Sequence, residues 1–134
     1  MWDQLLGLNL FPPEIAQREI AFYLTKQNEF GLPLDSRKSY TKSDWILWTA
    51  TMAGSGEDFQ ALVHPVYRFM NETSSRMPLS DWHETTNGKS VGFRARSVVG
   101  GYYIKMLADS WRAAPARGKG QGHRSAAGSG LESR

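Results

Sequence analysis

The 134-residue sequence contains no cysteine, which is the first constraint on its chemistry. Without a thiol the chain can form neither a disulfide nor a thiolate metal site, and the redox compartment stays open. It also lacks an apolar run of the roughly 20 residues that a membrane-spanning helix needs. The first residues, Met1–Gln4, lack the basic and apolar segments of a signal peptide. We therefore expect no membrane partner, and we expect any secretion signal to lie upstream of this chain.

Most of the chain also lacks an excess of positive charge. Residues 1–112 have twelve basic and twelve acidic side chains, whereas residues 113–134 have four basic residues and one acidic residue, so the net charge of +3 belongs to the tail. Because a nucleic-acid-binding domain shows a basic patch or stripe, the neutral part predicts no nucleic-acid partner. The tail has five glycines and one large aliphatic residue, Leu131. It buries too little apolar surface to offset its ordering entropy, so we predict a disordered Gly/Ala/Ser/Arg tail.

Three common catalytic motifs are missing as well: a nucleophile elbow, a phosphate-binding loop and two histidines at metal-ligand spacing. We expect neither a cofactor nor a metal.

Helical periodicity is what the sequence does contain. Hydrophobic residues make up 40% of the chain and recur at helical spacing in five stretches. Residues 1–112 are therefore expected to form one mainly α-helical domain. The predicted helices are Trp2–Leu10, Pro13–Asn28, Thr41–Ala53, a helix capped by Ser55 with an apolar stripe from Phe59 to Met70, and Phe93–Trp111.

Local signals refine these helices. Pro13 suits a first helical turn. Thr41 and Asp44 have the spacing of a capping box at the start of the third helix, and capping is the favoured role of Asp44. Pro65 removes one backbone donor, so it should kink or locally break the fourth helix. Gly100–Gly101 costs about 1 kcal/mol per glycine against alanine, which indicates that another helix or backbone passes very close.

Two polar loops, residues 29–40 and 73–92, are longer than a helical hairpin requires, and functional sites tend to lie on such loops. The tight-turn signal Asn87–Gly88 predicts that residues 82–84 and 90–91 pair as a small β-hairpin. Each loop contains Pro-Leu followed by an acid, which is typical of an array of similar helical hairpins. Five helices cannot close such an array, so we expect the chain to expose a face that absent neighbours cover.

Three long stretches carry a resemblance to a known family. GLPLDSRKSYTKSDWILWTA, DFQALVHPVYRFMNET and RMPLSDWHETTNGKSVGFRARSVVGGYYIKML resemble the C-terminal end of the glutaminase A family, and the similarity extends over residues 1 to about 108. It implies an (α/α) six-hairpin toroid, of which this chain holds the last two to three hairpins. It also implies a secreted, extracellular enzyme that hydrolyses L-glutamine to L-glutamate and ammonia. The earlier hairpins are then the partners of this chain, which is expected to be inactive alone.

The resemblance brings no catalytic residues with it, so the candidates rest on their chemistry. Asp81, His83 and Glu84 form the densest ionisable cluster. In a strand, Asp81 and His83 share one face, where a carboxylate can orient an imidazole for general acid–base catalysis. The alternative is a hairpin whose polar groups satisfy one another. Asp35 is either an acid, a base or a ligand for a substrate amine, or a turn-capping residue paired with Arg37 or Lys38.

Three further residues are candidates for substrate binding. Arg94 and Arg96 can each grip a substrate carboxylate with two hydrogen bonds, or form a structural pair with an acid of the cluster. Trp82, and likewise Trp45, either packs in the core or offers its ring to a sugar. The resemblance implies glutamine as the small-molecule substrate. The alternative is a six-hairpin glycoside hydrolase, in which two carboxylates act on a glycoside. A third alternative is a non-catalytic remnant.

The sequence Asn71-Glu72-Thr73 is an N-glycosylation sequon, which suits a secreted protein.

Overall fold

The computed structural model describes residues 1–75 and 79–113. These ranges contain five α-helices, one 3-10 helix and two three-residue strands, so the mainly α-helical prediction is confirmed. No helix within them is long and apolar enough to cross a bilayer. The disordered tail predicted for residues 113–134 lies, from residue 114 on, outside the described residues. The elements are α1 (Trp2–Leu6), α2 (Pro13–Leu24), β1 (Tyr40–Lys42), α3 (Ser43–Ala50), α4 (Gly56–Glu72), β2 (Trp82–Glu84), the 3-10 helix η1 (Ser97–Tyr103) and α5 (Ile104–Ala113).

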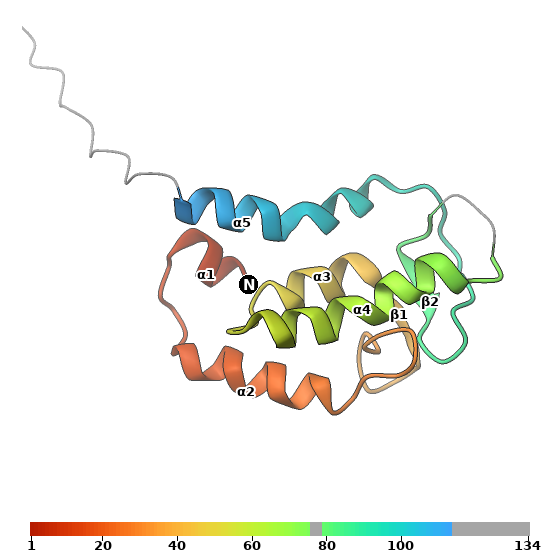
Figure 1. Ribbon diagram of the computed structural model, residues 1–134, viewed down its shortest axis with the longest axis horizontal. Helices are drawn as coiled ribbons and strands as arrows, with labels where there is room; N and C mark the ends of the chain where they lie inside the picture. Colours follow the sequence, from red (N-terminus) through yellow and green to blue (C-terminus); the bar gives the residue numbers. More distant parts are fainter. Residues whose placement is uncertain (76–78, 114–134) are drawn as a thin grey trace, which may run out of the picture.

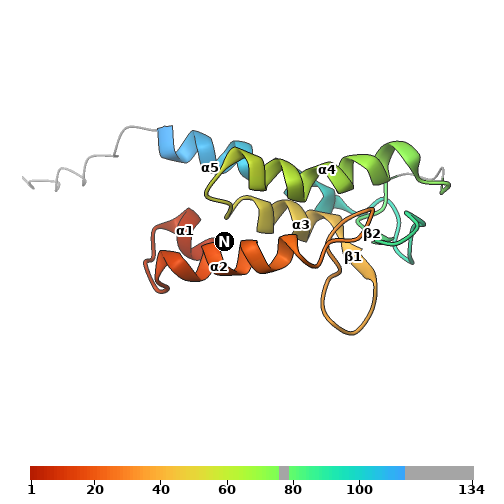
Figure 2. The same cartoon turned by 60° about the horizontal axis from the view of Figure 1, so that its bottom comes forward.

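Helix α3 lies at the centre of the arrangement. It packs most extensively against α4 and η1, while α2 packs against α4 (Figure 1). The turned view in Figure 2 shows the two strands together at one end of the helices. The buried faces of α2, α3 and α4 meet in two clusters, which confirms the predicted stripes of α2 and α4 as core faces. On α3 the core face is formed by Ile46, Leu47 and Ala50, whereas Trp45 is exposed. One cluster is built on Ile20, Ala50 and Leu62, and the other on Ile46, Leu47 and Val66.

Three helix boundaries differ from the prediction. Helix α1 ends at Leu6, because Gly7 adopts a left-handed conformation with φ 63° and caps the C-terminus of the helix. Helix α2 begins at Pro13 as predicted but ends at Leu24. Helix α3 begins only at Ser43, because residues 40–42 are extended and pair with another strand. Thr41 is therefore a strand residue, and the predicted capping box of Thr41 and Asp44 is wrong.

Helix α4 shows how an internal proline is accommodated. Ser55 caps the helix as predicted, because its Oγ accepts a hydrogen bond from the backbone N of Asp58 at 3.1 Å. Pro65 has no N–H to donate to the carbonyl of Ala61, four residues earlier. The Nε2 of Gln27 donates to that carbonyl instead, at 3.0 Å. This carbonyl therefore keeps a hydrogen-bond partner, and α4 continues through Pro65 without the predicted break.

Only the second half of the last predicted helix is α-helical. Ala95 has φ 48°, residues 97–103 form a 3-10 helix, and the α-helix begins at Ile104. The close approach predicted for the glycine pair is confirmed at Gly101. A Cβ atom there would lie 2.6 Å from Nε1 of Trp48, and this Nε1 donates to the Gly101 carbonyl at 3.2 Å. Gly100 has no atom within 4 Å of the same position.

Gly101→Ala is expected to lower the free energy of unfolding by about 1–3 kcal/mol, because the new methyl group displaces the Trp48 indole from a packed position. Gly100→Ala is the matched control. Its methyl group meets open space, and removing a glycine restricts the unfolded chain, so stability should stay the same or rise by less than about 1 kcal/mol. Urea denaturation of the two variants measures both values. Equal effects would contradict the assigned packing of Trp48 on Gly101.

Candidate functional site

The two long loops meet in a two-stranded antiparallel ribbon. Strand β1 ends the first loop and β2 lies within the second, with Thr41 opposite His83 and Lys42 opposite Trp82. The predicted hairpin is present as a bridge between His83 and Ser90, flanked by backbone hydrogen bonds from Glu84 N to the Lys89 carbonyl at 2.9 Å and from Val91 N to the Trp82 carbonyl at 3.1 Å. The sequence did not indicate β1, with which β2 pairs along its whole length. Since strand residues alternate between faces, the ribbon has a buried face and an outer face.

His83 occupies the buried face and is completely enclosed. Its ring stacks on Phe69 with the centroids 3.8 Å apart, and its Nε2 lies 2.7 Å from the carbonyl oxygen of Phe30. A carbonyl can only accept, so Nε2 carries the proton. Burial lowers the pKa of His83 to about 4, with the hydrogen bond to Phe30 and the charge of Glu84 acting weakly in the opposite direction. His83 is thus a neutral ring that anchors the ribbon to the core.

Asp81 precedes the ribbon and is also completely buried, but its partner is Arg96 instead of His83. Arg96 grips both carboxylate oxygens, with Nε to Oδ1 at 3.0 Å and Nη2 on Oδ2. The backbone N and the Oγ of Ser43 donate to the Asp81 carbonyl at 2.8 and 3.1 Å. The structural alternative for Arg96 is therefore observed, while the expected pairing of Asp81 with His83 is not. Arg94 is exposed on the adjoining loop.

Asp44 is a second buried carboxyl, in the first turn of α3. Its Oδ1 has no hydrogen-bond partner among the described residues, and its Oδ2 lies 3.8 Å from Nζ of Lys42. Burial raises the pKa of Asp44, Lys42 lowers it and Asp81 raises it further. Nearby, the Tyr102 hydroxyl lies 2.5 Å from Oγ of Ser43, and burial raises the pKa of Tyr102 to about 12. Two carboxyls and a phenol therefore share one buried cluster.

Asp44→Asn is expected to leave the free energy of unfolding at pH 7 unchanged within about 1 kcal/mol, or to raise it. The folded pKa of Asp44 lies above its ordinary value, so this carboxyl stabilises the fold at low pH and loses that contribution as the pH rises through the folded pKa. The amide keeps the shape and removes the penalised charge. Asp81→Asn, which breaks the Arg96 pair, is the contrasting control. Thermal unfolding at pH 7 compares the two, and equal losses would contradict the different states assigned to these carboxyls.

The outer face of the ribbon presents a different chemistry. Trp82 packs against Tyr40, with the ring centroids 5.0 Å apart, and against Phe93 at 5.8 Å. The Lys42 ammonium lies 5.1 Å from the centroid of Trp45. Glu84 accepts a hydrogen bond from Ser39 at 2.6 Å and is only half-buried. This face thus combines an ammonium, a carboxylate and aromatic rings, which are groups that can bind a small polar molecule.

Asp35 stands apart from the ribbon, in a turn of the first loop. Its carboxylate pairs with the exposed Arg37, with Nη2 to Oδ2 at 2.6 Å and Nε to Oδ1 at 3.0 Å. The hydrogen bonds from Arg37 hold the pKa of Asp35 at about 2. This is the turn pairing that the sequence offered as the alternative to a site residue. Within the ranges that the structure describes, no three acidic or histidine side chains gather in a way that could hold a metal ion.

Comparison with known proteins shows the family to which the sequence belongs. Residues 1–106 match the glutaminase A six helical-hairpin domain. The chain belongs to the glutaminase A family. It is similar to glutaminase A of Aspergillus oryzae, with 35% identity over 109 residues that cover 78% of the chain and 16% of that protein. A probable glutaminase of Arthroderma benhamiae is 38% identical over 96 residues, which cover 69% of the chain and 11% of that protein. No solved structure gives a significant match.

In this glutaminase A family chain, sequence reasoning identified β2 but missed β1, the other strand of the ribbon, and Asp44, the second buried carboxyl. Asp44 was interpreted as a helix cap because Thr41 lies at the matching spacing. A signal was present, however: the tripeptide Ser-Asp-Trp occurs at residues 43–45 and again at 80–82. The serines and aspartates of both copies are buried, and the two copies are joined by the hydrogen bonds from Ser43 to Asp81.

Proposed function

We propose that this chain supplies part of the substrate site of an enzyme that hydrolyses L-glutamine to L-glutamate and ammonia. The outer face of the β1–β2 ribbon carries the proposal, because Lys42 and Glu84 bring opposite charges to the two sides of Trp82. Diagonal neighbours on such a ribbon lie about 7–8 Å apart, so one small molecule can reach both. The names of the two relatives support glutamine as that molecule.

Each group on this face has a role in the proposed reaction. The Lys42 ammonium, with the exposed Arg94 beside the site, binds the α-carboxylate of glutamine. The rings of Trp82 and Tyr40 pack against its aliphatic chain. Glu84 acts as general base: it takes a proton from a water molecule whose oxygen attacks the amide carbon. The C–N bond then breaks, the proton passes from Glu84 to the leaving nitrogen, and ammonia departs. Asp81, His83 and Arg96 position the ribbon from its buried face, and Asp35 stays outside this reaction.

The proposal extends to the whole enzyme. The chain spans less than a fifth of the two relatives, so the remaining hairpins are needed to complete the site, and we expect the chain alone to be inactive. We propose that these hairpins close into a toroid and that the enzyme is extracellular. The sequon at Asn71 lies on an exposed turn of α4, where a glycan can be accommodated. Full-length protein that stays inside the cells that produce it, with a mass that endoglycosidase treatment does not lower, would argue against that location.

A chimera tests the activity. Residues 1–106 replace the matching segment of the A. oryzae glutaminase A, and ammonia release from L-glutamine is measured for the chimera and for this chain alone. We expect release by the chimera only. A folded chimera that is inactive on glutamine but active on a panel of glycosides would overturn the proposal in favour of a glycoside hydrolase.

Glu84→Gln in the chimera is expected to lower kcat about 100-fold, because the amide still accepts the Ser39 hydrogen bond but cannot take a proton. Glu57→Gln, on the exposed first turn of α4, is the matched control and should leave kcat unchanged. Steady-state ammonia release measures both variants. An unchanged kcat in the Glu84 variant would remove Glu84 from the reaction.

A further inference from the structure

A groove of about 930 Å³ runs between α2, α3 and the first loop, beside the ribbon. One wall is formed by a stripe of α2 with Glu19, Phe22 and Tyr23, at the spacing i, i+3 and i+4, and by Lys26 in the turn that follows the helix. The facing wall is a stripe of α3 that contains Trp45 and Thr49, one turn apart. Residues 32–39 close one end of the groove. The two long walls of the groove are thus the faces of two helices.

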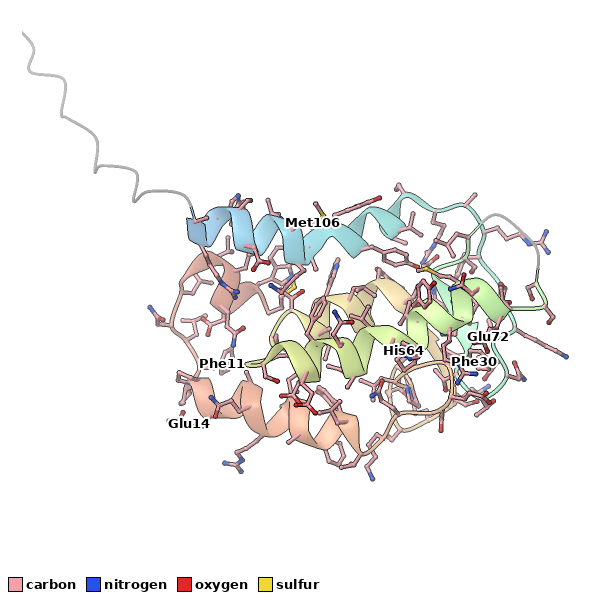
Figure 3. The ribbon with its side chains drawn as sticks, viewed as in Figure 1. Phe11, Glu14, Phe30, His64, Glu72 and Met106 are labelled. Carbon is pink, nitrogen blue, oxygen red and sulfur yellow. The ribbon has the colours of Figure 1, made fainter. Side chains whose placement is uncertain are left out.

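The groove exposes large aromatic surface to water. Phe22 is 54% exposed and Trp45 is 49% exposed, although α2 and α3 bury other residues, Ile20 and Ile46 among them, in the core. The structure leaves further apolar side chains uncovered on α5, where Met106 lies (Figure 3). Contiguous exposed apolar surface between helices marks a site of interaction.

We propose that this groove is the seat of an amphipathic helix from another hairpin of the same six-hairpin domain. Six hairpins require more helices than the five α-helices that the described residues supply. The two relatives are several times longer than this chain, so their additional length can supply the occupant. A groove between two helix stripes is the usual receptor for a third helix, which inserts a row of apolar residues at helical spacing. Free glutamine, by contrast, would leave most of this volume empty.

The charges at the two ends of this wall specify the occupant further. Glu19 lies on α2 before the aromatic pair, and Lys26 lies in the turn after it. The bound helix is therefore expected to carry an apolar stripe about two turns long, with a basic residue near Glu19 and an acidic residue near Lys26. The proposal rests on membership of the family and on the groove, not on glutamine hydrolysis.

Crosslinking identifies the occupant. Because the chain has no cysteine, Thr49→Cys places one thiol in the groove, and a benzophenone maleimide on it captures whatever lies within reach. The labelled chain is mixed with the A. oryzae glutaminase A from which the matching segment has been deleted. We expect a crosslink to a helix of that protein, and little crosslinking from the control Gln60→Cys, on the exposed side of α4. A crosslink to a second copy of this chain, equal yields from the two positions, or no crosslink overturns the proposal.

A second measurement avoids the docking of separate chains. In the chimera described above, Phe22→Asp is expected to lower Tm by several degrees, because it buries a charge under the docked helix. Tyr67→Asp replaces an aromatic residue of similar exposure on α4, outside the groove, and is expected to change Tm by less than about 2 °C. Equal shifts would show that the groove stays open in the assembled domain. Neither readout depends on ammonia release, so this proposal and the proposed activity can fail independently.

Discussion

Replacing Arg96 with methionine is expected to lower the free energy of unfolding by about 3 kcal/mol, at the lower end of the range for a broken buried ion pair. Methionine preserves the length of the apolar stem, but it loses the guanidinium, whose Cζ lies 4.3 Å from the centroid of the Phe93 ring. It removes the guanidinium that grips Asp81, and because Asp81 is completely enclosed, its carboxylate is left without a counter-charge. Arg96 itself is about one third exposed, which is why we expect the lower end of the range. Urea denaturation at pH 7 measures the loss.

The chain offers a close control for this prediction. Arg94→Met changes the same side chain two residues away, where the arginine is exposed, and should alter the free energy of unfolding by less than about 0.5 kcal/mol. The double variant Arg96→Met, Asp81→Asn removes both members of the pair and should recover part of the loss, since no buried charge remains. A loss in the double variant equal to the sum of the two single losses would mean that the two residues do not interact.

The parts of the fold that the sequence predicts are those set by residues close together in the chain. Pro13 fixes the start of α2, and Ser55 caps α4 through an amide three residues away. The boundaries that were wrong depend on distant partners. Residues 40–42 satisfy the spacing of a helix start, yet they become a strand because β2 lies 42 residues further along and supplies the hydrogen bonds. Gln27 likewise reaches across 34 residues to the carbonyl that Pro65 leaves free.

In the candidate site, too, the sequence predicts what depends on nearby residues and not what depends on distant partners. The sequence identified the cluster of Asp81, His83 and Glu84, and the alternation along a strand correctly separates His83 from Glu84. It could not identify the partners of the cluster. His83 pairs with Phe30 and Phe69, and Asp81 pairs with Arg96, so the two residues that seemed to form one acid–base pair each have another role. Alternation gives the face of a side chain, but only the tertiary fold decides which distant group covers that face.

The loop end of the molecule is held together by further long-range contacts of this kind. Arg68 of α4 lies over the ring of Phe30 and pairs with Glu29 and Glu72, so one residue ties the first loop to the end of α4 (Figure 3). Thr85 is buried beside them, donating to the Ser39 carbonyl and accepting from Asn28. The first loop therefore cannot shift without displacing the carbonyl of Phe30, on which His83 depends.

Lowering the pH from about 6.5 to about 4 is expected to reduce the contribution of His83 to stability by about 3 kcal/mol. The ordinary pKa of histidine is 6.5, and that of buried His83 is about 4. Between these values the unfolded chain binds a proton on this ring that the folded chain does not bind, so stability rises with pH throughout this window. The stabilisation is complete above pH 6.5 and is lost as the pH falls towards 4. Protonation would place a charge between the Phe69 ring and the core, where water cannot reach it.

The free energy of unfolding of the protein and of His83→Gln, measured by urea denaturation from pH 4 to pH 7.5, isolates this contribution. Glutamine can still donate to the Phe30 carbonyl but does not titrate, so the difference between the two curves should shrink by about 3 kcal/mol as the pH falls. Asp44, whose folded pKa is raised, acts with the opposite sign, but it is present in both proteins and cancels in the difference. His64→Gln, on the exposed side of α4, should leave the pH dependence as it is. Parallel curves for the protein and the His83 variant would mean that His83 has the same pKa in the folded and unfolded states, and that its burial does not penalise the charged ring.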